Sequence, residues 1–234
     1  MGLLHVERID STNAEARRLT ELGERGPLWI WADEQTAGRG RLGRAWVSPP
    51  GNLHATLLFE TRATPDVAAQ LSFVAALAVH DVATELRPEA RVSIKWPNDV
   101  LLEGAKFSGI LLEVVATGPT VMALGCGINL AHAPLGMSYP VTQLGGRFTP
   151  ETVLEILAGK LAWRLTQWAD GEGFGLIREA WLERAAGLGA EVIAEDGTRG
   201  KFQGLAPDGA LILERSDGSR HLIRAGDVRL RATA

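Results

Sequence analysis

The order of the apolar stretches constrains the fold of this chain more than any other feature. Runs rich in β-branched residues outnumber helical patterns and often follow one another directly, so the regular strand–helix alternation of a parallel sheet is absent. These strand-like runs are residues 28–32, 53–59, 91–96, 107–116 and 120–128. We therefore predict an α+β fold built on a mixed, largely antiparallel sheet with helices.

Helical patterns are fewer and have clear ends. The dipeptide Thr-Pro at 64–65 and again at 149–150 places a capping residue before a proline, and apolar residues then recur at helical spacing. A shorter helix is predicted from Thr12, a candidate N-cap with Glu15 three residues later, and a fourth helix over about 174–186.

The C-terminal part of the chain has a different pattern, with short alternating runs separated by tight-turn signals. The dipeptide Asp-Gly, which favours β-hairpins, occurs at 196–197, 208–209 and 217–218. Short strands at this spacing indicate a small β-barrel. We predict two domains, a larger one over residues 1–187 and a small barrel over residues 188–234.

Composition excludes several classes of function. The net charge of −4 argues against general affinity for nucleic acids or membranes, and no uninterrupted apolar run approaches the length of a membrane span. Cys126 is the only cysteine, which excludes an internal disulfide and a cysteine-based zinc cluster. The N-terminus shows no signal-peptide pattern, so we expect a cytoplasmic protein.

Residues 38–46 hold three glycines and three arginines before Trp46. The glycines match a dinucleotide-binding fingerprint, but the prolines and glycine that follow forbid the helix that such a site requires, so a Rossmann fold is excluded. The stretch is then a loop between strands, in which freed backbone amides and the guanidinium groups of Arg39, Arg41 and Arg44 suit carboxylate and phosphate oxygens. The alternative is an arginine loop that is exposed to solvent and binds no ligand. The arginines alone do not distinguish an anion-binding loop from such a solvated loop.

A second polar cluster begins at Lys95. Pro97 and Asn98 break the strand, which places Asp99 at a turn, and Lys106 follows shortly afterwards. A carboxylate suits a magnesium ion or its waters, and lysines supply point charges for phosphate oxygens. A plain turn is the simpler alternative for this segment.

Ser11, Thr12 and Asn13 form a third cluster. Capping of the following helix explains them without a ligand. The same three small polar side chains at a helix N-terminus also suit a polar, uncharged head group.

Together and in this order, these stretches resemble the biotin protein ligases. The resemblance is carried by residues 11–13, 34–46, 95–100, 106–111 and 125–129, and it extends over nearly the whole chain. It implies a class II synthetase-like catalytic domain with an SH3-like C-terminal barrel. It also implies the monofunctional form, because the first motif begins too early in the chain to leave room for a DNA-binding domain.

The resemblance implies a role for each motif residue. Biotin would be bound by Ser11, Thr12, Asn13, Gln35, Gly38, Arg39, Gly40, Arg41 and Lys106. ATP would be bound by Arg41, Arg44, Trp46, Lys95, Lys106 and Asn129. The catalytic residues would be Arg39, Asp99 and Lys106, with Asp99 also meeting Mg²⁺. The chain departs from the family at Leu42, where many members have arginine, and at Cys126, where a small aliphatic residue is frequent.

The implied reaction has two steps. ATP activates biotin to biotinyl-5′-AMP, and biotin then passes to a lysine of a biotin carboxyl carrier protein domain. No enzyme nucleophile is needed. Two roles for Asp99 stay open, as general base for the acceptor lysine or as a residue that orients the metal and the lysines, and a homodimer is compatible with this architecture.

Three other functions are considered. A lipoate or octanoate protein ligase shares the fold, but it would have little use for polar residues arranged around a ureido ring. A nucleic-acid-binding module would use the arginine loop, although the acidic net charge argues against it. A catalytically silent sensor of biotin or nucleotide would have no need for Lys95, Asp99 and Lys106 together.

Overall fold

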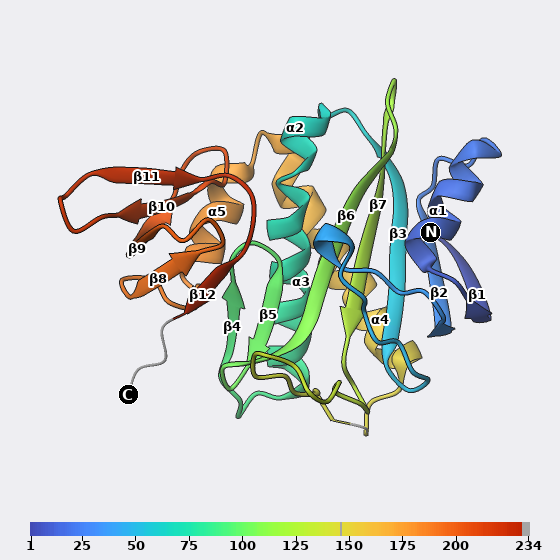
Figure 1. Cartoon of the computed structure of the whole chain (residues 1–234). Helices are drawn as coiled ribbons and strands as arrows, with labels where there is room; N and C mark the ends of the chain where they lie inside the picture. Colours follow the sequence, from blue (N-terminus) through green and yellow to red (C-terminus); the bar gives the residue numbers. More distant parts are fainter. Residues whose placement is uncertain (146, 231–234) are drawn as a thin grey trace.

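The computed structural model describes residues 1–145 and 147–230, and its largest element is a seven-stranded sheet (Figure 1). The strands, in spatial order, are β1 (Gly2–Ile9), β2 (Leu28–Gln35), β3 (Leu53–Thr61), β7 (Thr120–Ile128), β6 (Ala105–Ala116), β5 (Asp99–Leu102) and β4 (Val92–Lys95). Only β1 and β2 pair in parallel, and every other neighbouring pair is antiparallel. The predicted mixed, largely antiparallel sheet is confirmed.

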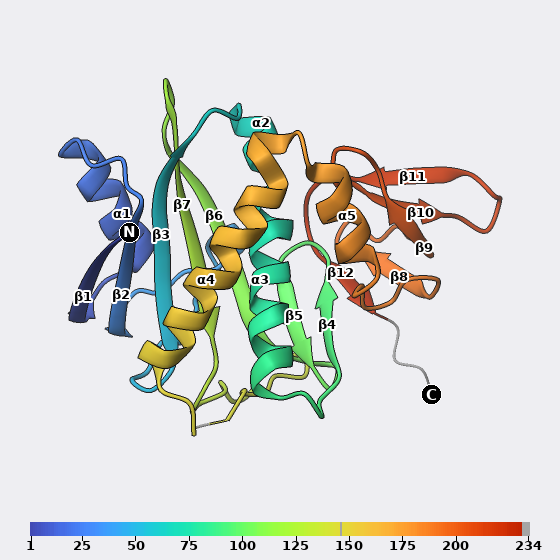
Figure 2. The same cartoon turned by 180° about the vertical axis from the view of Figure 1, so that it is seen from behind.

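Helices cover the two faces of this sheet unequally (Figure 2). They are α1 (Thr12–Glu21), α2 (Pro65–Ala68), α3 (Leu71–Leu86), α4 (Pro150–Trp168) and α5 (Phe174–Leu182). Trp29 and Trp31 of β2 belong to the large core formed with α3 and α4, whereas Ile30 between them packs against α1. This alternation places α1 on the face of the sheet opposite α3 and α4.

One helical stretch is apolar enough to raise the question of a membrane. Pro65–Leu86, which spans α2 and α3, has the length and composition of a transmembrane helix, but 67% of its apolar window is buried inside the protein. Ten residues of α3 are buried, in a core shared with α4 and the sheet. The apolar sequence of this stretch is therefore explained by its place in the core.

The C-terminal strands form a separate five-stranded antiparallel sheet. Its spatial order is β11 (Arg220–Ile223), β10 (Leu211–Glu214), β9 (Arg199–Leu205), β8 (Glu191–Ala194) and β12 (Val228–Leu230), so β11 and β12 lie at its two edges. All three Asp-Gly dipeptides lie in hairpins between these strands, as predicted, and each aspartate accepts a hydrogen bond from the backbone two residues later. The boundary at residues 187 and 188 stays a prediction.

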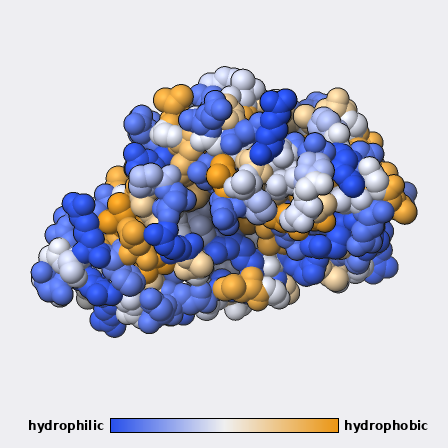
Figure 3. Space-filling view, turned by 90° about the horizontal axis from the view of Figure 1, so that it is seen from above, coloured by the Kyte–Doolittle hydropathy of each residue, from blue (hydrophilic) through white to orange (hydrophobic). Residues whose placement is uncertain are grey.

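The small sheet packs on α5 through aromatic side chains. Trp181 of α5 makes edge-to-face contacts with Phe202 of β9 and with Phe73 of α3. Trp96, at the end of β4, donates a hydrogen bond from its indole to Gly209 O at 3.1 Å. The face of the molecule shown in Figure 3 is mostly hydrophilic with scattered apolar groups. Trp181, Phe202 and Phe73 are buried, so the two sheets are joined through a buried apolar core.

Candidate active site

The glycine-rich stretch forms a small hairpin between β2 and β3, on the face of the large sheet that α3 and α4 do not cover. Gly40 N donates to Arg44 O at 2.7 Å, and Trp46 N donates to Gly38 O at 2.9 Å. A Cβ at Gly38 would lie 2.6 Å from both Ser48 Oγ and Trp46 O. Glycine is therefore required there so that the two arms of the hairpin can approach each other.

Three glycines lie in the sheet below this hairpin, where a side chain would meet Trp46 or Asn13. A Cβ at Gly127 of β7 would lie 2.6 Å from the indole of Trp46, and a Cβ at Gly109 of β6 would lie 3.1 Å from the same ring. A Cβ at Gly125 would collide with Asn13 Oδ1. The missing side chains let Trp46 and Asn13 lie directly on the strands.

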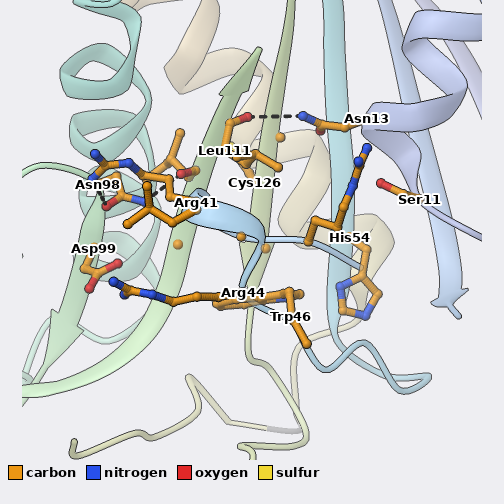
Figure 4. Close-up of a pocket in the computed structure, with 18 of the residues that line it drawn as sticks. Ser11, Asn13, Arg41, Arg44, Trp46, His54, Asn98, Asp99, Leu111 and Cys126 are labelled. Carbon is orange, nitrogen blue, oxygen red and sulfur yellow. Dashed lines mark hydrogen bonds between the residues drawn. The ribbon is translucent and has the colours of Figure 1, made fainter. Parts of the chain in front are cut away.

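A pocket lies between the hairpin and this floor. Eleven of the fourteen predicted site residues line it: Ser11, Thr12, Asn13, Gln35, Arg39, Gly40, Arg41, Arg44, Trp46, Asp99 and Lys106. Arg44 extends toward Asp99 at one end of the pocket, and Ser11 and Asn13 lie at the other end (Figure 4).

The three remaining predicted residues lie outside the lining. Gly38 lies at the base of the hairpin. Lys95 contacts Asp99 Oδ2 from outside the pocket lining. Asn129 is 3% exposed and donates its amide to Thr142 O at 3.0 Å, so in this structure it holds the segment after β7. Its predicted contact with adenine stays a prediction.

One end of the pocket is polar and uncharged. The backbone N and the hydroxyl of Thr12 both donate to Gln35 Oε1, at 2.9 and 3.1 Å, and Gln35 Nε2 donates to Ser48 Oγ at 2.9 Å. The N-cap of α1 is Ser11, whose hydroxyl oxygen accepts from Ala14 N. The predicted cap at Thr12 is therefore wrong by one residue, and the shift frees Thr12 to hold Gln35.

The other end of the pocket is ionic. Asp99 Oδ1 lies 2.6 Å from Lys106 Nζ, and Asp99 Oδ2 lies 3.1 Å from Lys95 Nζ. Asp227, in the turn before β12 of the small sheet, lies 2.9 Å from Lys95 Nζ and 3.2 Å from Arg44 Nη1. Both sheets therefore contribute charged groups to this end of the pocket.

Neighbouring opposite charges favour the charged forms of Lys95 and Asp227. Burial alone would lower the pKa of Lys95, but the carboxylates of Asp99 and Asp227 outweigh it and raise that pKa. Burial alone would raise the pKa of Asp227, but Lys95 and Arg44 lower it. Burial lowers the pKa of Arg41, whose guanidinium also donates to Asn98 Oδ1 at 3.3 Å. Arg41, Arg44 and Lys106 thus line a space suited to anionic oxygens, and Lys95 lies next to it, paired with Asp99 and Asp227.

Comparison with known proteins agrees with this geometry. Residues 5–129 match the biotin/lipoate A/B protein ligase family, and residues 187–231 match the biotin protein ligase C-terminal domain. A biotin–[acetyl-CoA-carboxylase] ligase from Paracoccus denitrificans is 48% identical over 95% of this chain and 98% of its own length. The chain belongs to the biotin protein ligases. The resemblance inferred from the sequence motifs is confirmed.

Other biotin protein ligases support this assignment. The enzyme from Mycobacterium tuberculosis is 34% identical over 95% of this chain and 86% of its own length. The structure of the biotin protein ligase from Aquifex aeolicus in complex with biotin and ATP superposes with a TM-score of 0.82 at 28% identity, covering 99% of each chain. The lipoate alternative has weaker support, because these relatives are biotin ligases.

Among the residues of this ligase that contact the site and were not predicted are Asn98, Asp227, His54, Thr56 and Glu113. Glu113 had a signal in the sequence, since it is the single charged residue in the apolar run 107–116. Asp227 had none, because only the packing of the small sheet brings it to Lys95.

His54 lies on the pocket face of β3 and is only 1% exposed. Burial lowers its pKa to about 4, so its imidazole is neutral at physiological pH. Its ring nitrogen Nε2 lies 3.3 Å from Pro49 O, and Nδ1 has no hydrogen-bond partner among residues 1–145 and 147–230. A neutral ring in this position adds a polar group to the pocket wall without adding charge.

We expect His54 to make the ligase less stable below neutral pH. The unfolded chain takes up a proton near pH 6.5, whereas the folded chain does so only near pH 4. Stability should therefore fall as pH decreases from about 6.5 to 4, by about 3 kcal/mol. Urea denaturation at pH 7.5 and pH 5 checks this in wild type and His54→Gln, with the exposed His132→Gln as control. We expect the unfolding free energy to depend less on pH in His54→Gln than in the other two proteins. An equal pH dependence in all three would show that His54 does not cause the loss of stability.

Proposed function

We propose that this ligase binds biotin with its ureido ring at the uncharged end of the pocket and its carboxylate toward the ionic end. ATP enters at the ionic end, and biotin then passes to a lysine of a biotin carboxyl carrier protein domain. The observation that carries this proposal is one pocket with a neutral hydrogen-bonding end and a cationic end. The two ends match the two ends of biotin.

The first step brings two anions together. An oxygen of the biotin carboxylate forms a bond to the α-phosphorus of ATP, the bond from that phosphorus to the β-phosphate oxygen breaks, and pyrophosphate leaves. Two unit charges 4 Å apart repel by about 4 kcal/mol at an effective dielectric constant of 20. Lys106 and the hairpin arginines Arg39 and Arg41 offset this repulsion at the reacting groups, and Lys95 and Arg44 do so at the outer phosphates.

In the second step the neutral amine of the acceptor lysine attacks the acyl carbon of biotinyl-5′-AMP, and AMP leaves. Both carboxylate oxygens of Asp99 are already within ion-pair distance of lysines. This favours Asp99 as the residue that orients Lys95 and Lys106 over Asp99 as a general base. The hairpin would also cover the mixed anhydride, which water hydrolyses.

Magnesium is proposed to arrive with the ATP phosphates. It would neutralise phosphate charge when bound. The described residues contain no group of three or more acidic, histidine or cysteine side chains that could hold a metal, so a site formed by the protein alone does not fit. A single carboxylate fits an ion that keeps its waters and phosphate ligands, and Asp99 would meet the ion through water.

The transfer reaction tests this function. We expect the ligase with ATP, Mg²⁺ and biotin to add one biotinyl group to a biotin carboxyl carrier domain, measured by mass spectrometry. A carrier whose acceptor lysine is replaced by arginine should stay unmodified. Transfer of lipoate or octanoate in place of biotin would overturn the proposal in favour of the lipoate ligases.

Trp46 is proposed to pack beside the adenine of ATP, so its position should matter for ATP. In Gly127→Ala the new Cβ would lie 2.6 Å from the indole, and the ring has to move away from the floor. We expect the KM for ATP to rise about tenfold with little change in the KM for biotin. Gly159→Ala, in α4 with nothing within 4 Å of the new Cβ, is the matched control. An unchanged KM for ATP in Gly127→Ala would remove Trp46 from the ATP site.

Location and assembly are also proposals. A cytoplasmic ligase agrees with the single buried Cys126, because a reducing compartment keeps such a thiol free. The division into domains 1–187 and 188–234 agrees with the separate five-stranded sheet. A homodimer, the other proposed partner besides the carrier, is tested by the mass of the ligase in solution.

A further inference from the structure

We propose that Glu113 is a positioning residue for recognition of the biotin head group, and that it acts by fixing the orientation of the Asn13 amide. The inference rests on the proposed function. Glu113 belongs to β6 and Asn13 to the first turn of α1, and Asn13 lines the pocket (Figure 4).

The surroundings of Asn13 allow one orientation of its amide. Asn13 Nδ2 lies 2.7 Å from Glu113 Oε2 and 3.4 Å from Leu111 O, two groups that can only accept hydrogen bonds. On the other side, the Thr56 hydroxyl lies 2.7 Å from Asn13 Oδ1 and 2.8 Å from Thr12 Oγ1, and it can donate its one proton to Asn13 Oδ1. Asn13 is 4% exposed and Thr56 is fully buried. Turning the amide over would place oxygen against oxygen at both acceptors, which is unfavourable for a side chain as buried as Asn13.

This orientation decides what Asn13 offers to a ligand. Both amide protons are directed to Glu113 and Leu111, whereas Oδ1 keeps one lone pair after accepting from Thr56. Asn13 can therefore only accept from a ligand, and the group that it selects is an N–H donor. A ureido ring carries two such N–H groups.

A carboxylate at position 113 maintains this orientation better than an amide would. Both oxygens of Glu113 accept hydrogen bonds, so either one can face Asn13, and the other lies 3.8 Å from Arg17 Nη2. A glutamine would turn its oxygen toward the Arg17 cation and its NH₂ toward Asn13. Asn13 would then turn its own oxygen toward position 113 and present NH₂ to the ligand.

An exchange of the two groups tests the inference. Glu113→Gln and Asn13→Asp should each raise the KM for biotin at least about tenfold in ATP–pyrophosphate exchange, the first by turning the amide and the second by placing two carboxylates together. The double variant Asn13→Asp/Glu113→Gln again pairs one donor with one acceptor, with the two roles exchanged, and keeps an acceptor oxygen of residue 13 for the ligand. We expect its KM for biotin to return to within about threefold of wild type, with the KM for ATP unchanged throughout.

The control is Glu60→Gln, an exposed glutamate on β3, which should match wild type. Melting temperatures identify any variant that fails to fold. Single variants with the wild-type KM for biotin, or a folded double variant as impaired as the singles, would overturn the inference. Absence of biotin-dependent exchange in the wild-type protein would instead overturn the proposed function, so the two failures are distinguishable.

Discussion

Lys106→Ala is expected to lose biotin affinity and adenylation together. Lys106 Nζ lies 2.6 Å from Asp99 Oδ1 and 5.5 Å from the centre of the Trp46 ring, between the hairpin and the strands. Its charge is placed where the biotin carboxylate and the α-phosphate are proposed to meet. Removing it should slow ATP–pyrophosphate exchange by about a hundredfold or more and raise the KM for biotin.

Lys201→Ala is the matched control for this variant, because Lys201 is an exposed lysine on β9 that does not line the pocket. It should exchange pyrophosphate like wild type. If Lys106→Ala kept normal exchange and lost only transfer of biotin to the carrier, Lys106 would act on the acceptor and the proposed placement of the two anions would be wrong.

Asp99→Asn is expected to impair both half-reactions. Asp99 is 6% exposed and is the carboxylate shared by Lys95 and Lys106. An asparagine would offer one oxygen and one NH₂ to two ammonium groups. Lys95 would keep Asp227 as a partner, but Lys106 would lose its carboxylate. Unfolding free energy should fall by about 3 kcal/mol or more, and pyrophosphate exchange by about a hundredfold.

Two assays on the same preparation separate the roles of Asp99. One is pyrophosphate exchange, and the other is transfer from preformed biotinyl-5′-AMP to the carrier. A positioning role predicts that exchange falls at least as much as transfer. Loss of transfer with normal exchange would make Asp99 the general base. Asp66→Asn, on the exposed surface of α2, should leave both rates unchanged.

Local signals in the sequence predicted most of the elements. The Thr-Pro dipeptide at 149–150 starts α4 as predicted, and the Asp-Gly dipeptides form the C-terminal hairpins. β1 was missed because an exposed edge strand beside β2 need not alternate polar and apolar residues. β5 was missed because it has only four residues, and Asp99, predicted in a turn, is its first residue.

The motif residues of the site were predictable because the motifs, taken together and in order, resemble those of the biotin protein ligases, and the fold brings eleven of the fourteen residues to one pocket. What the sequence could not show is the set of groups that tertiary packing adds. Asp227 reaches Lys95 from the other sheet, and Thr56 and Glu113 come from two different strands to meet Asn13. Such contacts depend on strand register and sheet packing, which no local pattern encodes.

ATP–pyrophosphate exchange by the purified protein shows whether it activates biotin with ATP. Labelled pyrophosphate is incubated with ATP, Mg²⁺ and the protein, with biotin, lipoate or no acid added. We expect exchange that requires biotin, because the pocket is proposed to hold the biotin carboxylate and a phosphate of ATP together. Exchange supported by lipoate alone, or no exchange despite measurable biotin binding, would contradict it.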